Sequence, residues 1–287
     1  MTNALEVRGL NKRYPKSDFA LKDVNLIVPQ GTIMGFVGEN GAGKSTTMGC
    51  IMNTLIKDSG SVRVFGTEMT DDATALRDQI GVVYDTNPFP EYLTPKQVGK
   101  AMTAIYTNWD EPLFRSLLEK LKLPYNKSIK SFSRGMTMKF QIAVALAHHP
   151  KLLILDEPTS GLDPMVREDI LELLLDYVQD ETNSVLFSSH ITTDLEKIAD
   201  YITFIHDGEV IFSDTKDELL YHYGIVRARV AQVSQLDPTD IIASKNRGHQ
   251  IDVLLRHKEA ARRKYRDMVI DDASIEEIML LIAKGQR

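Results

Sequence analysis

Alternating apolar and polar positions mark the first thirty residues of the chain. Residues 5–8 and 24–28 place apolar side chains at every second position, and turn-forming residues lie between the two stretches. Successive side chains of a strand point to opposite faces, so this period of two indicates strands with one buried face. The pattern predicts a short antiparallel sheet near the N-terminus.

Continuous apolar runs follow this alternation. Residues 32–37 lead into a glycine-rich loop, and residues 44–56 read as a helix. Further apolar strands are expected at residues 80–84, 152–155, 185–188 and 201–205. Strands that are apolar at every position and alternate with helices are typical of a largely parallel sheet covered on both faces. The fold class is therefore predicted to be α/β.

Between residues 94 and 141 the apolar period changes to that of a helix. The positions that show the i, i+3, i+4, i+7 spacing are Phe114, Leu117, Leu118 and Leu121. We expect a helical subdomain at about residues 94–141, inserted into a core domain of residues 1–218.

The pattern changes again after about residue 218. Strand-like stretches at 225–233 and 251–255 and a final helix at 274–284 predict a small α+β accessory domain, residues 219–287. Its basic positions (Lys258, Arg262, Arg263, Lys264 and Arg266) could contact lipid or nucleic acid, but a solvated helix face is the preferred interpretation.

Composition narrows the class of protein. The 287 residues are 43% hydrophobic and 26% charged with a net charge of -6, as in an ordinary globular protein, so no nucleic-acid partner is expected. The single cysteine cannot form an internal disulfide, and no secretory signal is visible. No apolar run approaches the roughly 20 residues of a membrane-spanning helix. We expect a cytoplasmic protein that needs a separate partner for any work across a membrane.

Residues 38–45 match the phosphate-binding pattern G-x-x-x-x-G-K-[ST] between a predicted strand and a predicted helix. Glycines let backbone N–H groups surround phosphates, and the helix adds its positive N-terminal end. Lys44 is expected to reach the β- and γ-phosphates, and the Ser45 hydroxyl to hold Mg²⁺. The candidate nucleotide-binding residues here are Gly38, Asn40, Gly41, Ala42, Gly43, Lys44, Ser45 and Thr46.

Two carboxylates end the apolar strand at 152–155. Adjacent acids at a strand end project differently, so Asp156 is assigned to Mg²⁺ and Glu157 to orienting or deprotonating the attacking water. Two solvated loop acids are the alternative, which a preceding phosphate loop disfavours. Together the two motifs predict ATP hydrolysis with ATP and Mg²⁺ as cofactors.

Four further segments resemble the motifs of ABC ATPases. Residues 133–136 are similar to the family's L-S-G-G-Q signature, residues 160–163 to its D-loop, and residues 188–190 to its switch-histidine motif; Tyr14 occupies the place of its adenine-stacking aromatic residue. The resemblance covers roughly residues 4–215. It implies that His190 contacts the γ-phosphate and that Tyr14 stacks on adenine. In isolation, His190 would be interpreted as an ordinary strand-end histidine and Tyr14 as a cap on a hydrophobic edge.

The resemblance also implies an assembly. Ser133 and Gly135 would complete the ATP site of a second ATPase subunit, in a homodimer or a heterodimer. The pair would lie on the inner face of the membrane and would drive export through a separate transmembrane permease. The variant motifs and the accessory domain look most like exporters of drugs, antimicrobial peptides or other amphiphiles. A soluble ABC ATPase that acts as an ATP-gated regulator is the alternative.

Two positions depart from the family pattern. Asp85 stands where the family usually carries a glutamine, and its carboxylate is added to the predicted metal residues Ser45 and Asp156; a solvent-facing turn residue is the alternative. Arg134 replaces the first glycine of the signature, and its guanidinium is expected to reach a phosphate or a carboxylate, or to point outward.

Overall fold

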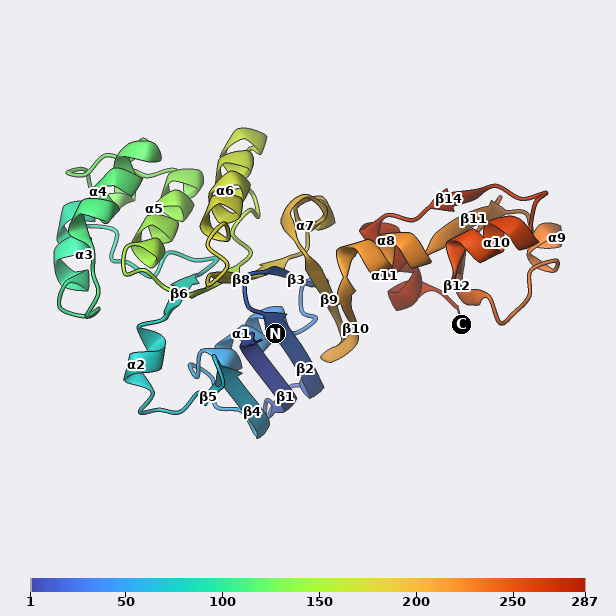
Figure 1. The fold of residues 1–287 in the computed structure, drawn as a ribbon, viewed down its shortest axis with the longest axis horizontal. Coiled ribbons are helices and arrows are strands. Elements are labelled where there is room, and N and C mark those ends of the chain that lie inside the picture. The colour runs from blue at the N-terminus through green and yellow to red at the C-terminus, as the bar shows by residue number, and fades with distance from the viewer. Residues whose placement is uncertain (1, 287) are drawn as a thin grey trace.

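The structure is a computed structural model that describes residues 2–286, and it contains three sheets (Figure 1). The central sheet has six strands in the order β10-β9-β3-β8-β7-β6. Its strands are β3 (Ile33–Val37), β6 (Ile80–Val83), β7 (Leu152–Asp156), β8 (Ser184–Ser189), β9 (Tyr201–His206) and β10 (Glu209–Thr215). All neighbours are parallel except β9 and β10. The predicted α/β class with a mostly parallel sheet is confirmed.

The second sheet is antiparallel and covers one face of the central sheet. Its order is β2-β1-β4-β5, formed by β1 (Asn3–Arg13), β2 (Ala20–Pro29), β4 (Ser59–Val64) and β5 (Thr67–Glu68). Alternate residues of β3 explain the layering, because Met34 and Phe36 join the core on this side while Ile33 and Val37 join the core on the other. The expected N-terminal antiparallel sheet is present.

Helix α1 (Lys44–Ile51) lies between these two sheets, and the prediction of a helix to residue 56 was too long. The carbonyl of Gly49 accepts hydrogen bonds from the amides of Thr54 and Leu55, and Asn53 takes a left-handed φ of 57°. A left-handed residue just beyond the last turn ends a helix, which accounts for the difference.

The opposite face of the central sheet packs against helices (Figure 1). These helices include α6 (Pro164–Tyr177) and α7 (Thr192–Ile198). The short helix α2 (Thr74–Arg77) precedes β6 in the chain. The predicted helical region contains α3 (Pro95–Met102), α4 (Glu111–Lys120), the 3-10 turn η1 (Ile129–Ser131) and α5 (Arg134–Leu146), which share a separate hydrophobic core. Phe114, Leu118 and Leu121 are buried in that core. Across residues 2–286, the helices are too short or too polar to span a bilayer.

The C-terminal region forms a third, antiparallel sheet of order β12-β13-β11-β14. Its elements are α8 (Lys216–His222), β11 (Gly224–Ala228), α9 (Val230–Val233), β12 (Ile241–Asn246), β13 (Ile251–Leu255), α10 (Lys258–Lys264), β14 (Ile270–Asp272) and α11 (Ile275–Lys284). The strand predicted at 225–233 was too long. It ends at Ala228, because the Gln232 side chain accepts a hydrogen bond from the Arg229 amide and closes a helical turn.

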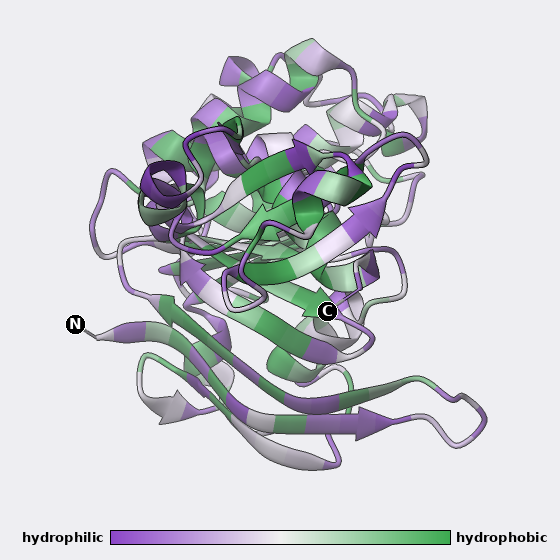
Figure 2. Cartoon of the chain, turned by 90° about the vertical axis from the view of Figure 1, so that its right-hand side faces the viewer, coloured by the Kyte–Doolittle hydropathy of each residue, from purple (hydrophilic) through white to green (hydrophobic). Residues whose placement is uncertain are grey.

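The accessory region shares a core with the ATP-binding region. Ile278 and Leu281 of α11 belong to the same hydrophobic cluster as Leu195 of α7 and Phe204 of β9. Figure 2 shows hydrophobic residues concentrated on the strands at the centre of the molecule. The boundary proposed between residues 218 and 219 falls within α8 and stays a prediction.

Candidate active site

The phosphate loop connects the end of β3 to the start of α1. Its backbone requires glycine at two positions in particular. Gly43 has a φ of 114°, and a Cβ atom there would lie 2.7 Å from Leu21 Cδ2. A Cβ atom on Gly38 would lie 2.5 Å from the Ile205 carbonyl oxygen. The loop is therefore packed tightly against β9 and β2, which fixes its shape.

The Lys44 side chain folds into this loop and is only 5% exposed. Its Nζ donates hydrogen bonds to the carbonyls of Gly38 at 2.7 Å and Glu39 at 3.2 Å, and it lies 3.1 Å from Glu157 Oε1. A buried ammonium group in this loop is suited to phosphate, because it is a compact point charge with rotatable donors. The role predicted for Lys44 toward the β- and γ-phosphates stays a prediction.

The two acids at the end of β7 point to different partners. Ser188 Oγ donates to Asp156 Oδ1 at 2.7 Å and accepts from the Glu157 amide at 3.0 Å. Glu157 itself has a left-handed φ of 52°. Ser188 thus ties both acids to the neighbouring strand β8, a role that the sequence analysis did not assign to it. The position of Ser188 within the 188–190 motif was the feature of the sequence that could have indicated this role.

Glu157 bridges the phosphate loop and the predicted switch histidine. Its Oε2 lies 2.6 Å from Nδ1 of His190, while Oε1 faces the Lys44 ammonium. Among the described residues, Oε1 is a buried atom with no hydrogen-bond partner of good geometry. A buried acceptor without a donor can take a hydrogen bond from a bound water. The arrangement suits a carboxylate that receives a proton.

A cavity of about 550 Å³ opens over these groups. It is lined by Phe19, Asn40, Gly41, Gly43, Lys44, Ser45, Thr46, Asp85, Asp156 and Glu157. Gly38 and Ala42 form the buried floor of the loop instead. Phe19 was missed by the sequence analysis: its ring lies 3.1 Å from the position that a Gly43 Cβ would occupy. No spacing rule singled it out.

Besides Gly38 and Ala42, three predicted binding residues lie outside the lining of this cavity. Tyr14 sits in the turn after β1, with the Lys12 ammonium 5.6 Å from its ring centre. Ser133 caps α5 by accepting a hydrogen bond from the Met136 amide at 3.2 Å. A Cβ atom on Gly135 would lie 3.0 Å from Val166 Cγ1, so this glycine faces α6. Their roles toward adenine and toward a second subunit stay predictions.

The two departures from the family pattern contact each other. Arg134 Nη2 lies 2.8 Å from Asp85 Oδ1, and both side chains are about half exposed. The guanidinium also lies beside Gly161 of the D-loop-like segment, whose Cβ would be 3.3 Å from Nη1. Of the expectations for Arg134, contact with a carboxylate is the one observed. Asp85 still borders the cavity with Asp156 and Glu157.

The donor set fits a nucleotide with Mg²⁺. The positive φ values at Gly41 and Gly43 shape a backbone cradle, and no atom lies within 4 Å of the position of a Gly41 Cβ. Ser45 and Asp156 add a hydroxyl and a carboxylate to the cavity wall, which are oxygen ligands of the kind that Mg²⁺ takes. A phosphate loop facing two strand-end carboxylates defines the chain as a P-loop nucleotide hydrolase.

Comparisons with known proteins narrow this class. The family model described as "ABC transporter" matches residues 21–160. The ABC transporter ATP-binding protein YtrB of Bacillus subtilis is 31% identical over 219 residues, 76% of this chain and 74% of that protein. The lantibiotic transport ATP-binding protein SrtF of Streptococcus pyogenes is 35% identical over 215 residues, 74% of this chain and 91% of that protein.

A solved structure agrees with these matches. An ATP-binding subunit of an ABC transporter superposes with a TM-score of 0.68 at 29% identity, over 75% of this chain and 91% of the other. The chain belongs to the family of ABC transporter ATP-binding subunits. It is an ATPase subunit of a transport system, and the alternative of a soluble regulator is not favoured.

Proposed function

We propose that this chain forms half of an ATPase pair that powers export of amphipathic peptides through a separate transmembrane permease. The observation that carries the catalytic part is the Glu157 carboxylate, held between Lys44 and His190 at the cavity. The peptide class rests on the likeness to the lantibiotic transport protein SrtF. The chain would lie on the cytoplasmic face of the membrane, bound through the permease.

The residues of the 550 Å³ cavity and the adjacent His190 divide the work of hydrolysis. Lys44 and the loop amides bind and orient the phosphates, and Glu157 accepts a proton from the attacking water. His190 holds the carboxylate through Nδ1 and presents its other ring nitrogen for the γ-phosphate. Mg²⁺, when bound, supplies positive charge against the phosphate oxygens, and Ser45 and Asp156 are the residues that would hold it.

Helix α5 supplies the proposed contact with a second ATPase subunit. Ser133 is exposed at the N-terminus of this 13-residue helix, where backbone N–H groups and the helix dipole favour an anion. Ser133 and Gly135 would thus meet the γ-phosphate bound by the partner copy. Arg134 is already paired with Asp85, so backbone donors would make this contact.

Purification from detergent-solubilised membranes tests the assembly. We expect the Glu157→Gln chain with ATP to retain an integral membrane protein, and the Lys44→Ala chain to lose it. With the purified complex, a lantibiotic should stimulate ATP hydrolysis. If both variants are recovered alone in the soluble fraction, the transport assignment fails. If the complex forms without peptide stimulation, the substrate class alone is wrong.

The Asp85 carboxylate is proposed as a secondary contributor to Mg²⁺ binding. We expect Asp85→Asn to raise the Mg²⁺ concentration needed for half-maximal ATPase activity by about threefold, since one exposed charge is lost near the metal. Asp156→Asn should raise it about 10- to 100-fold. Arg134→Gln is the matched control: it frees Asp85 from its ion pair, so the Mg²⁺ requirement should fall. An unchanged Mg²⁺ dependence in Asp85→Asn would remove Asp85 from the metal residues.

A further inference from the structure

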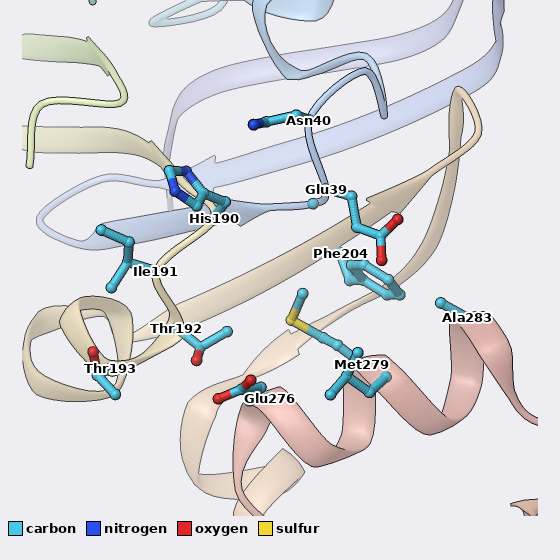
Figure 3. A pocket seen from close by; sticks show the side chains of 12 residues that line it. Glu39, Asn40, His190, Ile191, Thr192, Thr193, Phe204, Glu276, Met279 and Ala283 are labelled. Carbon is cyan, nitrogen blue, oxygen red and sulfur yellow. The ribbon is translucent and has the colours of Figure 1, made fainter. Parts of the chain in front are cut away.

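Helix α11 of the accessory region lies beside both segments that surround the γ-phosphate side of the site. Figure 3 shows it across from the loop residues Glu39 and Asn40 and from His190. Its N-terminal half packs near α7, which follows His190 in the chain, and its C-terminal half approaches the phosphate loop. The accessory region therefore reaches the nucleotide-binding machinery through one helix.

The N-terminal end of α11 is attached to α7. Ser274 and Glu277 form a reciprocal capping box, which leaves the Ile275 amide free for another acceptor. That acceptor is Glu196 Oε1 of α7, at 2.9 Å. The Glu196 carbonyl in turn accepts a hydrogen bond from Lys216 Nζ at 2.9 Å. These bonds join α11, α7 and α8.

The C-terminal end of α11 is held by backbone pairing. The amide and carbonyl of Gln286 bond with Ser244 of β12, at 2.7 and 2.9 Å. Gly285, which links α11 to this bridge, has no room for a side chain, because its Cβ would lie 2.3 Å from the Leu281 carbonyl oxygen. The backbone beside Lys284 is therefore fixed on the accessory sheet.

From this fixed position Lys284 forms an ion pair with Glu39, the second residue of the phosphate loop. The hydrogen bond from Lys284 lowers the pKa of the Glu39 carboxyl, so Glu39 is charged at neutral pH. The carbonyl of the same residue accepts a hydrogen bond from Lys44 Nζ at 3.2 Å. Glu39 thus contacts Lys284 through its carboxylate and Lys44 through its backbone carbonyl.

A cavity of about 480 Å³ separates the rest of α11 from the loop. Its lining includes Gly38 and Leu280. Figure 3 shows Asn40 and His190 across the cavity from Met279 and Ala283 of α11. Among the hydrogen bonds and ion pairs of residues 2–286, Lys284–Glu39 is the one that joins α11 to the phosphate loop. That pair is therefore the direct polar contact through which α11 can act on Glu39.

We infer that Lys284 is a positioning residue for ATP binding, which restrains Glu39 at the start of the phosphate loop. The accessory region would in this way adjust the ATP affinity of the subunit. The inference rests on the proposed role of residues 38–45 in binding ATP. The expected effect is modest, since an exposed ion pair contributes little in water.

The test measures ATP affinity by calorimetry for full-length variants in a Glu157→Gln background. Lys284→Met and Glu39→Gln are each expected to raise the Kd for ATP about two- to fivefold, the range of an exposed ion pair. Lys284→Arg and the double exchange Glu39→Lys with Lys284→Glu should keep the Kd near that of the parent, because each restores an ion pair. Lys264→Met is the matched control, since Lys264 pairs with Asp237 and Asp240 inside the accessory region.

Three outcomes would overturn the inference. Unchanged Kd values in both single variants would show that the ion pair does not position the loop. Tighter ATP binding by Glu39→Gln together with weaker ATP binding by Lys284→Met would indicate that long-range electrostatics, and not the position of Glu39, changes the affinity. An equal loss in Lys264→Met would indicate general destabilisation. Lys44→Ala separates these results from a failure of the site itself, because it should abolish binding whatever Lys284 does.

Discussion

Lys44→Ala is expected to abolish tight ATP binding. Lys44 is buried, its Nζ donates to two loop carbonyls, and it forms an ion pair with Glu157, so its removal takes away the charge that offsets the phosphates. Charge-assisted hydrogen bonds contribute about 1.5–3 kcal/mol each. The variant also leaves the Glu157 carboxylate facing the triphosphate without a cation. We expect the Kd for ATP, measured by calorimetry with Mg²⁺, to rise on the order of 10²-fold or more.

Lys22→Ala provides the control for this measurement. Lys22 is exposed and pairs with Glu209 on the surface, at 2.8 Å. Its loss should leave the Kd for ATP unchanged. An unaltered affinity in Lys44→Ala would defeat the assignment of residues 38–45 to phosphate binding.

Glu157→Gln is expected to retain ATP binding and to lower hydrolysis by on the order of 10² or more. The amide keeps the size of the side chain and can still bond with His190, but it cannot accept a proton from water. Single-turnover hydrolysis and ATP affinity should be measured on the same preparation. Glu168→Gln is the matched control, because Glu168 is an exposed residue of α6 that pairs with Lys197. Near-normal turnover by Glu157→Gln would show that another residue acts as the base.

Much of the site could be predicted because it lies at the ends of neighbouring parallel strands. Asp156 is the last residue of β7 and His190 follows β8, the strand paired with β7, while β3 on the other side of β8 leads into the phosphate loop. The carboxyl ends of parallel strands meet at one edge of a sheet, so motifs at those ends converge. The apolar runs placed the strands, and the motifs then placed the side chains.

The contacts that escaped prediction join residues without a local pattern. Arg134 and Asp85 are 49 positions apart, and their pairing depends on how α5 packs against β6. Phe19 reaches the cavity through the hairpin between β1 and β2, where no periodicity marks one aromatic residue over another. Strands β10 and β12 were missed because their mixed polar sequences lack the continuous apolar signal of the central strands.

The left-handed backbone of Glu157 lowers the stability of the fold but places the side chain that accepts a proton. A non-glycine residue with this φ of 52° costs roughly 1–2 kcal/mol. That turn of the chain swings the second acid away from the direction of the first, so Asp156 meets Ser188 while Glu157 meets His190. Exchanging the two acids would therefore not exchange their tasks. Glycine at position 157 would relieve this backbone cost, but it would also remove the ion pair with the buried Lys44, the contact with His190 and the proton acceptor.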